Sequence, residues 1–174
     1  MAKDLTKSVI DRQNILNNPY ALEEIHRATR IECFVFEGKA VLLKDQVADF
    51  FAVTPRTIDN YIARYEDELQ RNGYEVLRGN RLKRFKLEIM EQHVNENNFV
   101  NIKIPQLGVF DFRAFLNLAM LITESEPARL LRSTILDIVI DTINKKTGGA
   151  HLLWSVSRSK ISDPPYKIFT YRDH

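Results

Sequence analysis

Residues 44–64 carry the pattern that most restricts the fold, two helical segments joined by a very short break. From Lys44 onward the apolar residues follow helical spacing. Thr54 then provides an N-cap oxygen and Pro55 the fixed φ of a first helical turn, which predicts a second helix that ends near Gly73. Two helices with so little chain between them must cross steeply, so we predict a helix-turn-helix.

The side chains of this helix pair fit the packing of a DNA-reading helix-turn-helix. Ala48 is small where the helices would touch, Ala52 and Val53 occupy the turn, and Ile58 and Tyr61 fall at inward positions. Glycine is commoner at the position of Ala52, so we expect a slightly different turn there. The alternative is a pair of core helices with no groove to enter, because short helix pairs of this kind also occur in ordinary helical domains.

The outward positions of the second helix carry residue types that suit DNA. Hydroxyls near the helix start bind phosphate, Arg56 pairs with guanine edges, and Asn60 is the type that reads adenine bidentately. The acids at 66–68 come one to two turns later. For each residue alone, a solvated helix face is the alternative. The candidate DNA-binding residues of this region are Lys44, Thr54, Arg56, Thr57, Asn60, Tyr61 and Arg64.

A basic segment at 78–86 follows the helix pair. The β-forming stretches on either side of Gly79-Asn80 predict a tight hairpin. A hairpin behind a recognition helix has the position of a wing, whose cations contact the phosphate backbone, whereas most charge runs are only solvated surface. The candidate phosphate contacts are Arg78, Arg81, Lys83, Arg84 and Lys86.

For the chain as a whole we predict an α+β, mainly helical fold, a winged helix-turn-helix with small β-hairpins followed by a helical second half. Asn18-Pro19 opens an early helix, and Glu37-Gly38 separates the strands of a first hairpin. The predicted domains are 1–94 (N-terminal helix, hairpin and winged helix-turn-helix), 95–149 (helical dimerisation or interaction region) and 150–174 (an irregular tail, interpreted as the start of a continuation).

The second half contains two helices that are apolar on more than one side, opened by Asp111 and by Ser125. This half is either deeply packed or covered by a partner, and we predict a homodimer through these helices. Ser125, Arg129 and Arg132 form a polar group at one helix start that would suit an anion or a partner's acid. Capping and helix solvation explain these three residues equally well.

Composition excludes several classes of protein. A net charge of +2 does not argue for nucleic acid by itself, so an electropositive surface must be local. A single cysteine, Cys33, in an apolar stretch predicts a buried inert thiol, and neither a signal peptide nor a membrane span is evident. The four scattered histidines lack metal-ligand spacing, and no catalytic motif stands out. We therefore predict a cytoplasmic protein without metal, cofactor, membrane contact or enzymatic activity.

Two stretches resemble the bacterial RhuM-like virulence and DNA-binding proteins, relatives of phage antirepressors of the Bro and KilA-N kind. Residues 40–53 are similar to the family's strand running into its first reading helix. Residues 125–132 are similar to its Ser-x-x-Ala-x-x-x-Arg pattern after an apolar helix. Because relatives often stand beside death-on-curing (Fic/Doc) toxins or in mobile elements, the resemblance implies an antitoxin-like or antirepressor-like regulator of bacterial or phage origin, associated with the nucleoid.

The leading hypothesis is a sequence-specific transcriptional regulator that binds double-stranded DNA, reading the major groove with helix 55–71 and phosphates with the wing at 78–86. The alternative is a protein-interaction module, such as an antitoxin that neutralises a cognate Fic/Doc-type toxin, in which the helix-turn-helix is only a scaffold. An enzyme acting on nucleic acid is a third hypothesis, disfavoured because the sequence offers no acid-base or metal set.

Overall fold

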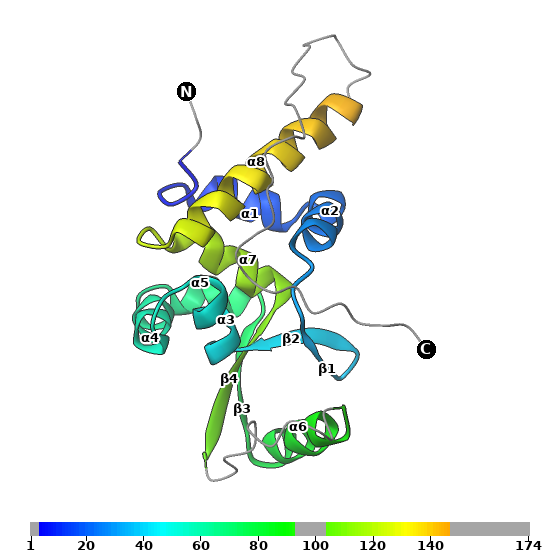
Figure 1. Cartoon of the computed structure of the whole chain (residues 1–174), viewed down its shortest axis with the longest axis vertical. Coiled ribbons are helices and arrows are strands. Elements are labelled where there is room, and N and C mark those ends of the chain that lie inside the picture. Colours follow the sequence, from blue (N-terminus) through cyan, green and yellow to red (C-terminus); the bar gives the residue numbers. More distant parts are fainter. Residues whose placement is uncertain (1–3, 93–103, 147–174) are drawn as a thin grey trace.

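A computed structural model describes residues 4–92 and 104–146 (Figure 1). It is α+β and mainly helical, as predicted. In chain order the elements are α1 (Val9–Leu16), α2 (Pro19–Thr29), β1 (Phe34–Phe36), β2 (Lys39–Leu43), α3 (Lys44–Phe50), α4 (Pro55–Arg64), α5 (Glu66–Arg71), β3 (Tyr74–Arg78), α6 (Gly79–Gln92), β4 (Gln106–Asp111), α7 (Phe112–Leu121) and α8 (Glu126–Lys146). The predicted tail at 150–174 lies outside the described residues.

Capping side chains open the helices where the sequence predicts them. The side chain of Asn18 accepts a hydrogen bond from the backbone N–H of Ala21 at the start of α2, and Asp111 does the same for α7. Glu37 and Gly38 both have positive φ, which suits the two-residue turn of the β1–β2 hairpin. These local predictions are confirmed, because each depends on residues that are neighbours in the sequence.

The helix pair α3–α4 is confirmed, with a turn that uses left-handed backbone at Ala52. Its φ is +52°, a conformation that glycine adopts freely and that alanine adopts at some cost. The backbone N–H of Val53 donates to the carbonyl of Ala48, which closes the turn. The prediction of one continuous helix from Pro55 to residue 71 is wrong, because the chain bends at Tyr65 and α5 starts as a separate helix.

The predicted hairpin at 78–86 is wrong, because these residues belong to α6. Leu82, Phe85 and Ile89 are buried and recur at spacings of three and four, the period of one helix face. This face packs on the sheet, so tertiary burial outweighs the local turn preference of Gly79-Asn80. The strand that pairs with β3 is β4, which the sequence did not lead us to expect.

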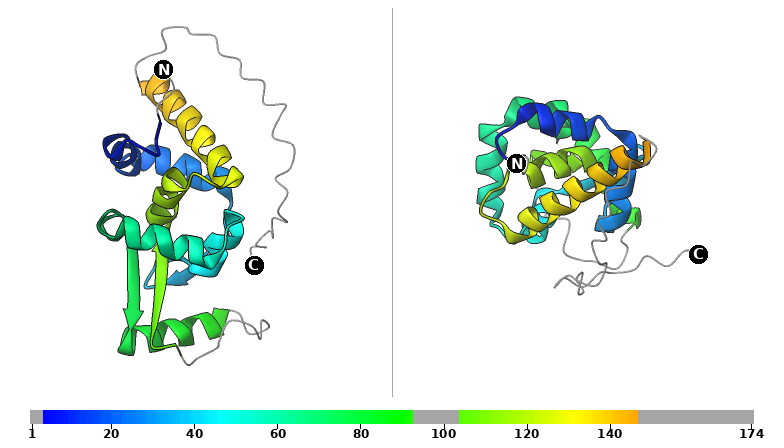
Figure 2. Two further views of the ribbon diagram at one scale, coloured as in Figure 1. Left: turned by 90° about the vertical axis from the view of Figure 1, so that its left-hand side faces the viewer. Right: turned by 90° about the horizontal axis from the view of Figure 1, so that it is seen from above.

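The four antiparallel strands have the order β1-β2-β4-β3. Leu77 and Val109 face α6 and belong to a small apolar cluster with Phe85. Tyr74 and Phe110 face the opposite way, into the main core that contains α3, α4 and α7. In Figure 2 the sheet therefore lies between α6 on one side and the other helices on the opposite side.

The boundary predicted near residue 95 does not divide the packing of the described residues. β4 pairs with β2 and β3, and one core cluster includes side chains from Leu5 to Ile135. Residues 114–121 of α7 are all buried in this core. In contrast, α8 extends beyond α2 at the end of the molecule opposite α6 (Figure 1). Deep packing thus explains the two-sided hydrophobicity of α7 but not that of the C-terminal half of α8.

Candidate nucleic-acid interface

The outer face of α4 is the polar surface that the α3–α4 helix pair presents to solvent. Ile58 is fully buried and anchors the helix to the core, which leaves Arg56, Asn60 and Arg64 exposed on the other side. Within the described residues, neither the Arg56 side chain nor the Asn60 side chain has an intramolecular hydrogen bond or ion pair. Their guanidinium and amide groups are therefore available to a ligand. The guanidinium of Arg64 lies over the ring of Tyr65 at 5.3 Å.

Two threonine hydroxyls mark the start of α4. Thr54 Oγ1 accepts from the backbone N–H of Thr57 at 3.2 Å, and the two hydroxyl oxygens lie 3.0 Å apart. Thr54 is exposed and Thr57 half-buried. The Thr54 hydroxyl caps α4. Thr54 is also exposed at the N-terminus of the helix, where anions bind favourably.

Lys44, a predicted DNA contact, is engaged by an acid of the same helix pair. Its Nζ lies 3.0 Å from both Oδ1 and Oδ2 of Asp59. The two side chains are 36% and 54% exposed. This ion pair joins the first residue of α3 to the middle of α4. It was not predicted, because the partners lie 15 residues apart in the sequence.

Tyr61 supports α4 from behind. Its hydroxyl donates to Glu124 Oε2 at 2.6 Å and accepts from the backbone N–H of Thr123 at 3.1 Å. Burial and the neighbouring Glu124 carboxylate raise the pKa of Tyr61 above its ordinary value. Ser125, in the same loop, donates to the carbonyl of Phe51 at 2.5 Å. The loop between α7 and α8 thus holds both the α3–α4 turn and α4.

The basic residues of 78–86 differ in their surroundings from those of α4. Arg81 pairs with Glu37 and Glu75, each at 2.8 Å, and Arg84 lies 3.5 Å from Glu37. The hydrogen bond from Arg81 lowers the pKa of the Glu37 carboxyl, and the same acids raise the pKa of Arg81. Acids of the β1–β2 turn and β3 therefore neutralise much of the predicted phosphate-binding charge.

The remaining three cations of this segment lie in different places. Arg78 is exposed at the end of β3, where its Nε donates to Gln106 Oε1 at 3.1 Å. Lys83 is exposed on α6, and Lys86 is half-buried. The structure does not gather the five predicted contacts onto one surface.

The polar group at the start of α8 serves the fold. Ser125 is buried and accepts from the backbone N–H of Ala128, as an N-cap does. Arg129 pairs with Glu126 one turn before it. Arg132 donates to the carbonyls of Ala119 and Ile122 at the end of α7, at 2.7 and 2.5 Å. Capping accounts for Ser125 and Arg132 and a surface ion pair for Arg129, so these residues form no common anion site.

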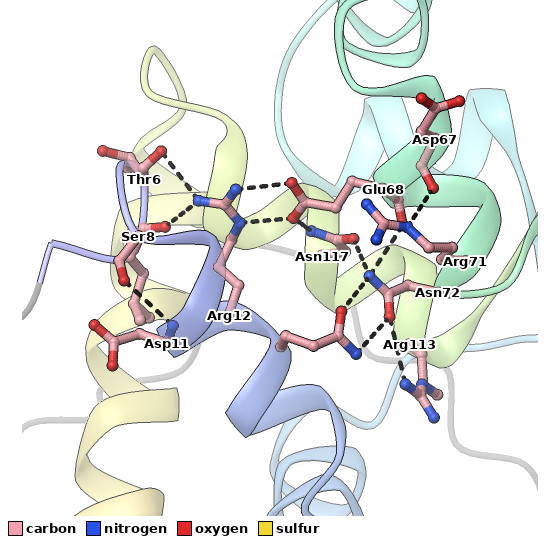
Figure 3. Close-up of polar contacts among 12 residues, drawn as sticks. Thr6, Ser8, Asp11, Arg12, Asp67, Glu68, Arg71, Asn72, Arg113 and Asn117 are labelled. Atoms are coloured by element: carbon pink, nitrogen blue, oxygen red, sulfur yellow. Dashed lines mark hydrogen bonds and ion pairs between the residues drawn. The ribbon is translucent and has the colours of Figure 1, made fainter.

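A buried polar network behind α5 was not predicted. Arg12 of α1 donates to both carboxylate oxygens of Glu68, at 2.7 and 2.8 Å, and Asn117 of α7 donates to the same carboxylate at 2.7 Å (Figure 3). Asn72 donates in turn to Asn117. Burial raises the pKa of Glu68, but the hydrogen bonds from Arg12 and Asn117 outweigh it and leave the pKa below its usual range. The network joins three helices and fixes α5, which follows α4 directly.

A groove of about 560 Å³ lies between the α3–α4 helix pair and α6. Lys44, Asp59, Val76 and Gly108 are among the residues that line it. A Cβ at Gly108 would lie 2.7 Å from the hydroxyl of Tyr74, so only glycine fits beside that ring. The two cations Lys44 and Lys86 are balanced by Asp45 and Asp59, so the groove has no charge preference.

The described part of the chain offers no candidate metal site, membrane-spanning helix or reactive thiol. No group of three or more His, Cys, Asp or Glu side chains there is placed to hold a metal ion. Within the same residues, no helix is long and apolar enough to cross a membrane. Cys33 is half-buried, and desolvation raises the pKa of its thiol to about 11, so the unreactive protonated form dominates at neutral pH.

Comparisons of the chain with models of protein families, with curated protein sequences and with solved structures found no match. The resemblance to the RhuM-like proteins therefore stays a prediction. The function must be argued from the site itself.

Proposed function

We propose that this chain is a sequence-specific DNA-binding regulator whose helix α4 enters the major groove. The observation that carries the proposal is the outer face of α4, where Arg56 and Asn60 are exposed and have no intramolecular partner among the described residues. Arginine and asparagine are the side chains that read guanine and adenine edges bidentately. The core residue Ile58 and the brace at Tyr61 fix α4 on the body, and a reading helix needs such rigid support.

The order of the elements supports a winged version of this motif. β2, α3, α4, α5, β3 and β4 occur in this order along the chain, with α6 between β3 and β4, and β4 pairs with β2 and β3. We propose that the β3–β4 ribbon is the wing and that α6 is an insertion at its far end. Side chains alternate along a strand, so Arg78 lies on the same sheet face as Tyr74, which packs toward α4. The proposed wing contact is therefore Arg78 at the ribbon end.

A homodimer is part of the proposal, with a smaller interface than the sequence predicts. Ile140 and Ile143 of α8 are 54% and 53% exposed, and Leu136 lies one turn earlier on the same side. Two copies joined by this stripe would present two α4 helices, as a symmetric operator requires. Sedimentation of the wild type and of Ile140→Glu/Ile143→Glu tests this. A wild-type monomer at micromolar concentration would contradict it.

The function is tested by titrating a mixed-sequence duplex, and a duplex selected from a random library by the wild-type protein, against salt. Binding that weakens several-fold between 50 and 200 mM salt is expected, since phosphate contacts release counterions. The double variant Arg56→Ala/Asn60→Ala should lose the preference for the selected duplex and keep its melting temperature. Absence of any DNA binding by the wild type would sink the proposal and leave the toxin-neutralising module as the alternative to pursue.

A further inference from the structure

Asp59 lies within the proposed reading face of α4. It comes three positions after Arg56 and directly before Asn60, and its side chain is 54% exposed. A free carboxylate there would repel the DNA phosphates and would also accept a hydrogen bond from the amino group of cytosine. An acid in this place therefore interferes with a helix that reads DNA, unless another group neutralises it.

Lys44 is the group that neutralises it. Both carboxylate oxygens of Asp59 lie 3.0 Å from the Lys44 ammonium, so the cation is shared between them. Lys44 begins α3, which Val47 and Ala48 fix in the core, and its stem lies against the groove wall, leaving the side chain 36% exposed. The ammonium that neutralises Asp59 thus belongs to α3, whereas the proposed reading residues belong to α4.

We infer that Lys44 is a positioning residue. Its ammonium neutralises the Asp59 carboxylate, so that α4 reads DNA through Arg56 and Asn60. The inference rests on the proposed DNA-binding function and revises the role predicted for Lys44, which was a direct contact with DNA. It has one strict consequence. The loss of Lys44 weakens DNA binding only while position 59 carries a negative charge.

A double-mutant cycle tests this consequence on the full chain. The proteins are the wild type, Lys44→Met, Asp59→Asn and Lys44→Met/Asp59→Asn, and the probe is the duplex selected by the wild type. Methionine keeps the apolar stem against the groove wall and removes only the charge. Lys44→Met should bind about fivefold more weakly at low salt, because it exposes an unpaired carboxylate beside the DNA. Asp59→Asn should bind no more weakly than the wild type, and the double variant should return to within about twofold of it.

A direct contact of Lys44 with phosphate would give a different result. If the double variant binds as weakly as Lys44→Met, and both lose about 0.9 from the slope of log K against log salt, Lys44 contacts phosphate itself and the inference is wrong. A folding defect is excluded if all three variants melt at the temperature of the wild type. Lys44→Gln replaces Lys44→Met if Lys44→Met melts at a lower temperature. Failure of the wild type to bind any duplex would instead remove the proposed function.

Discussion

Helices α4 and α6 are both amphipathic and both carry predicted DNA contacts, yet their charges have different surroundings. On α6, Arg81 faces Glu37 and Glu75, so its guanidinium is already occupied. On α4, Arg56 and Asn60 face solvent without an intramolecular partner in the described residues. A count of cations along a segment therefore does not identify a binding surface, because the acids that the fold brings opposite them decide what remains available.

The two helices also differ in what holds them. Apolar side chains such as Phe85 fix α6 on the sheet. The region of α4 and α5 depends in addition on polar groups, through the Tyr61 hydroxyl and the Glu68 carboxylate. We expect α6 to be sensitive to lost volume, and α4–α5 to be sensitive to lost charge and to pH.

The largest effects on stability should come from variants that remove the polar support of α5 or the apolar support of α6. Arg12→Met leaves the Glu68 carboxylate buried without its cation, which should lower the free energy of unfolding at pH 7 by about 3–5 kcal/mol. Phe85→Ala opens a cavity under α6 and should cost about 3–5 kcal/mol as well. Urea denaturation measures both values.

The pH dependence separates the two variants. In the wild type the pKa of Glu68 is depressed, so its contribution to stability is present above the unfolded pKa near 4.5 and is lost as pH falls through the lower folded value. Without Arg12, only the Asn117 hydrogen bond and the charge of Arg71 oppose the effect of burial, so the pKa of Glu68 should be higher than in the wild type. The stability deficit of Arg12→Met should therefore shrink as pH falls toward 4. Phe85→Ala should follow the wild type, and equal pH profiles for all three proteins would contradict the polar support of α5.

The next effect concerns DNA affinity. Arg56→Ala should weaken binding to the selected duplex by about 5- to 150-fold, the equivalent of 1–3 kcal/mol for a bidentate base contact. Arg84→Ala removes the same side chain from α6 and should change affinity by less than about twofold, because Glu37 already neutralises this group. Fluorescence anisotropy of a labelled duplex measures both. Equal losses of DNA affinity in the two variants would contradict the proposed difference between α4 and α6.

Local signals predicted much of the fold and the exposed face of α4. N-caps at Asn18, Thr54 and Asp111 fixed helix starts, since a cap acts within three residues. The exposed positions of α4 followed from its period. Helix α6 did not, because Gly79-Asn80 is a turn signal. The apolar face of Leu82, Phe85 and Ile89 is buried against strands that lie far away in the sequence.

Long-range pairings were beyond the sequence. β4 contains Gly108, which weakens a strand signal, and its partner β3 lies about 30 residues earlier. The contacts Lys44 to Asp59, Arg12 to Glu68 and Tyr61 to Glu124 join residues 15, 56 and 63 positions apart. No local rule pairs them, although Arg12 lies one turn before Ile15 and Leu16 on the same helix face, and a charge among apolar side chains of one face is a hint of a buried partner.

A smaller effect is expected for the brace behind α4. Tyr61→Phe removes the hydroxyl that bonds Glu124 and Thr123, which should lower the free energy of unfolding by about 1 kcal/mol. Because the folded pKa of Tyr61 is raised, its contribution is present below pH 10 and lost as pH rises through the folded value. The wild type should therefore lose stability above pH 10 more steeply than Tyr61→Phe in thermal melts. Parallel alkaline profiles would show that the hydroxyl does not brace α4.

The smallest effect should come from releasing the cations of α6. Glu37→Gln/Glu75→Gln removes the acids that occupy Arg81. The two glutamate side chains are 32% and 43% exposed and glutamine has nearly the same size, so the fold should tolerate the change. The freed guanidinium should bind phosphate without reading bases, so affinity for a mixed-sequence duplex should rise about twofold at low salt while the selected duplex gains no more. Arg81→Gln, made in the wild-type background, should leave both affinities unchanged. A loss of affinity in Arg81→Gln would mean that DNA displaces the acids in the bound state, and α6 would then belong to the interface together with α4.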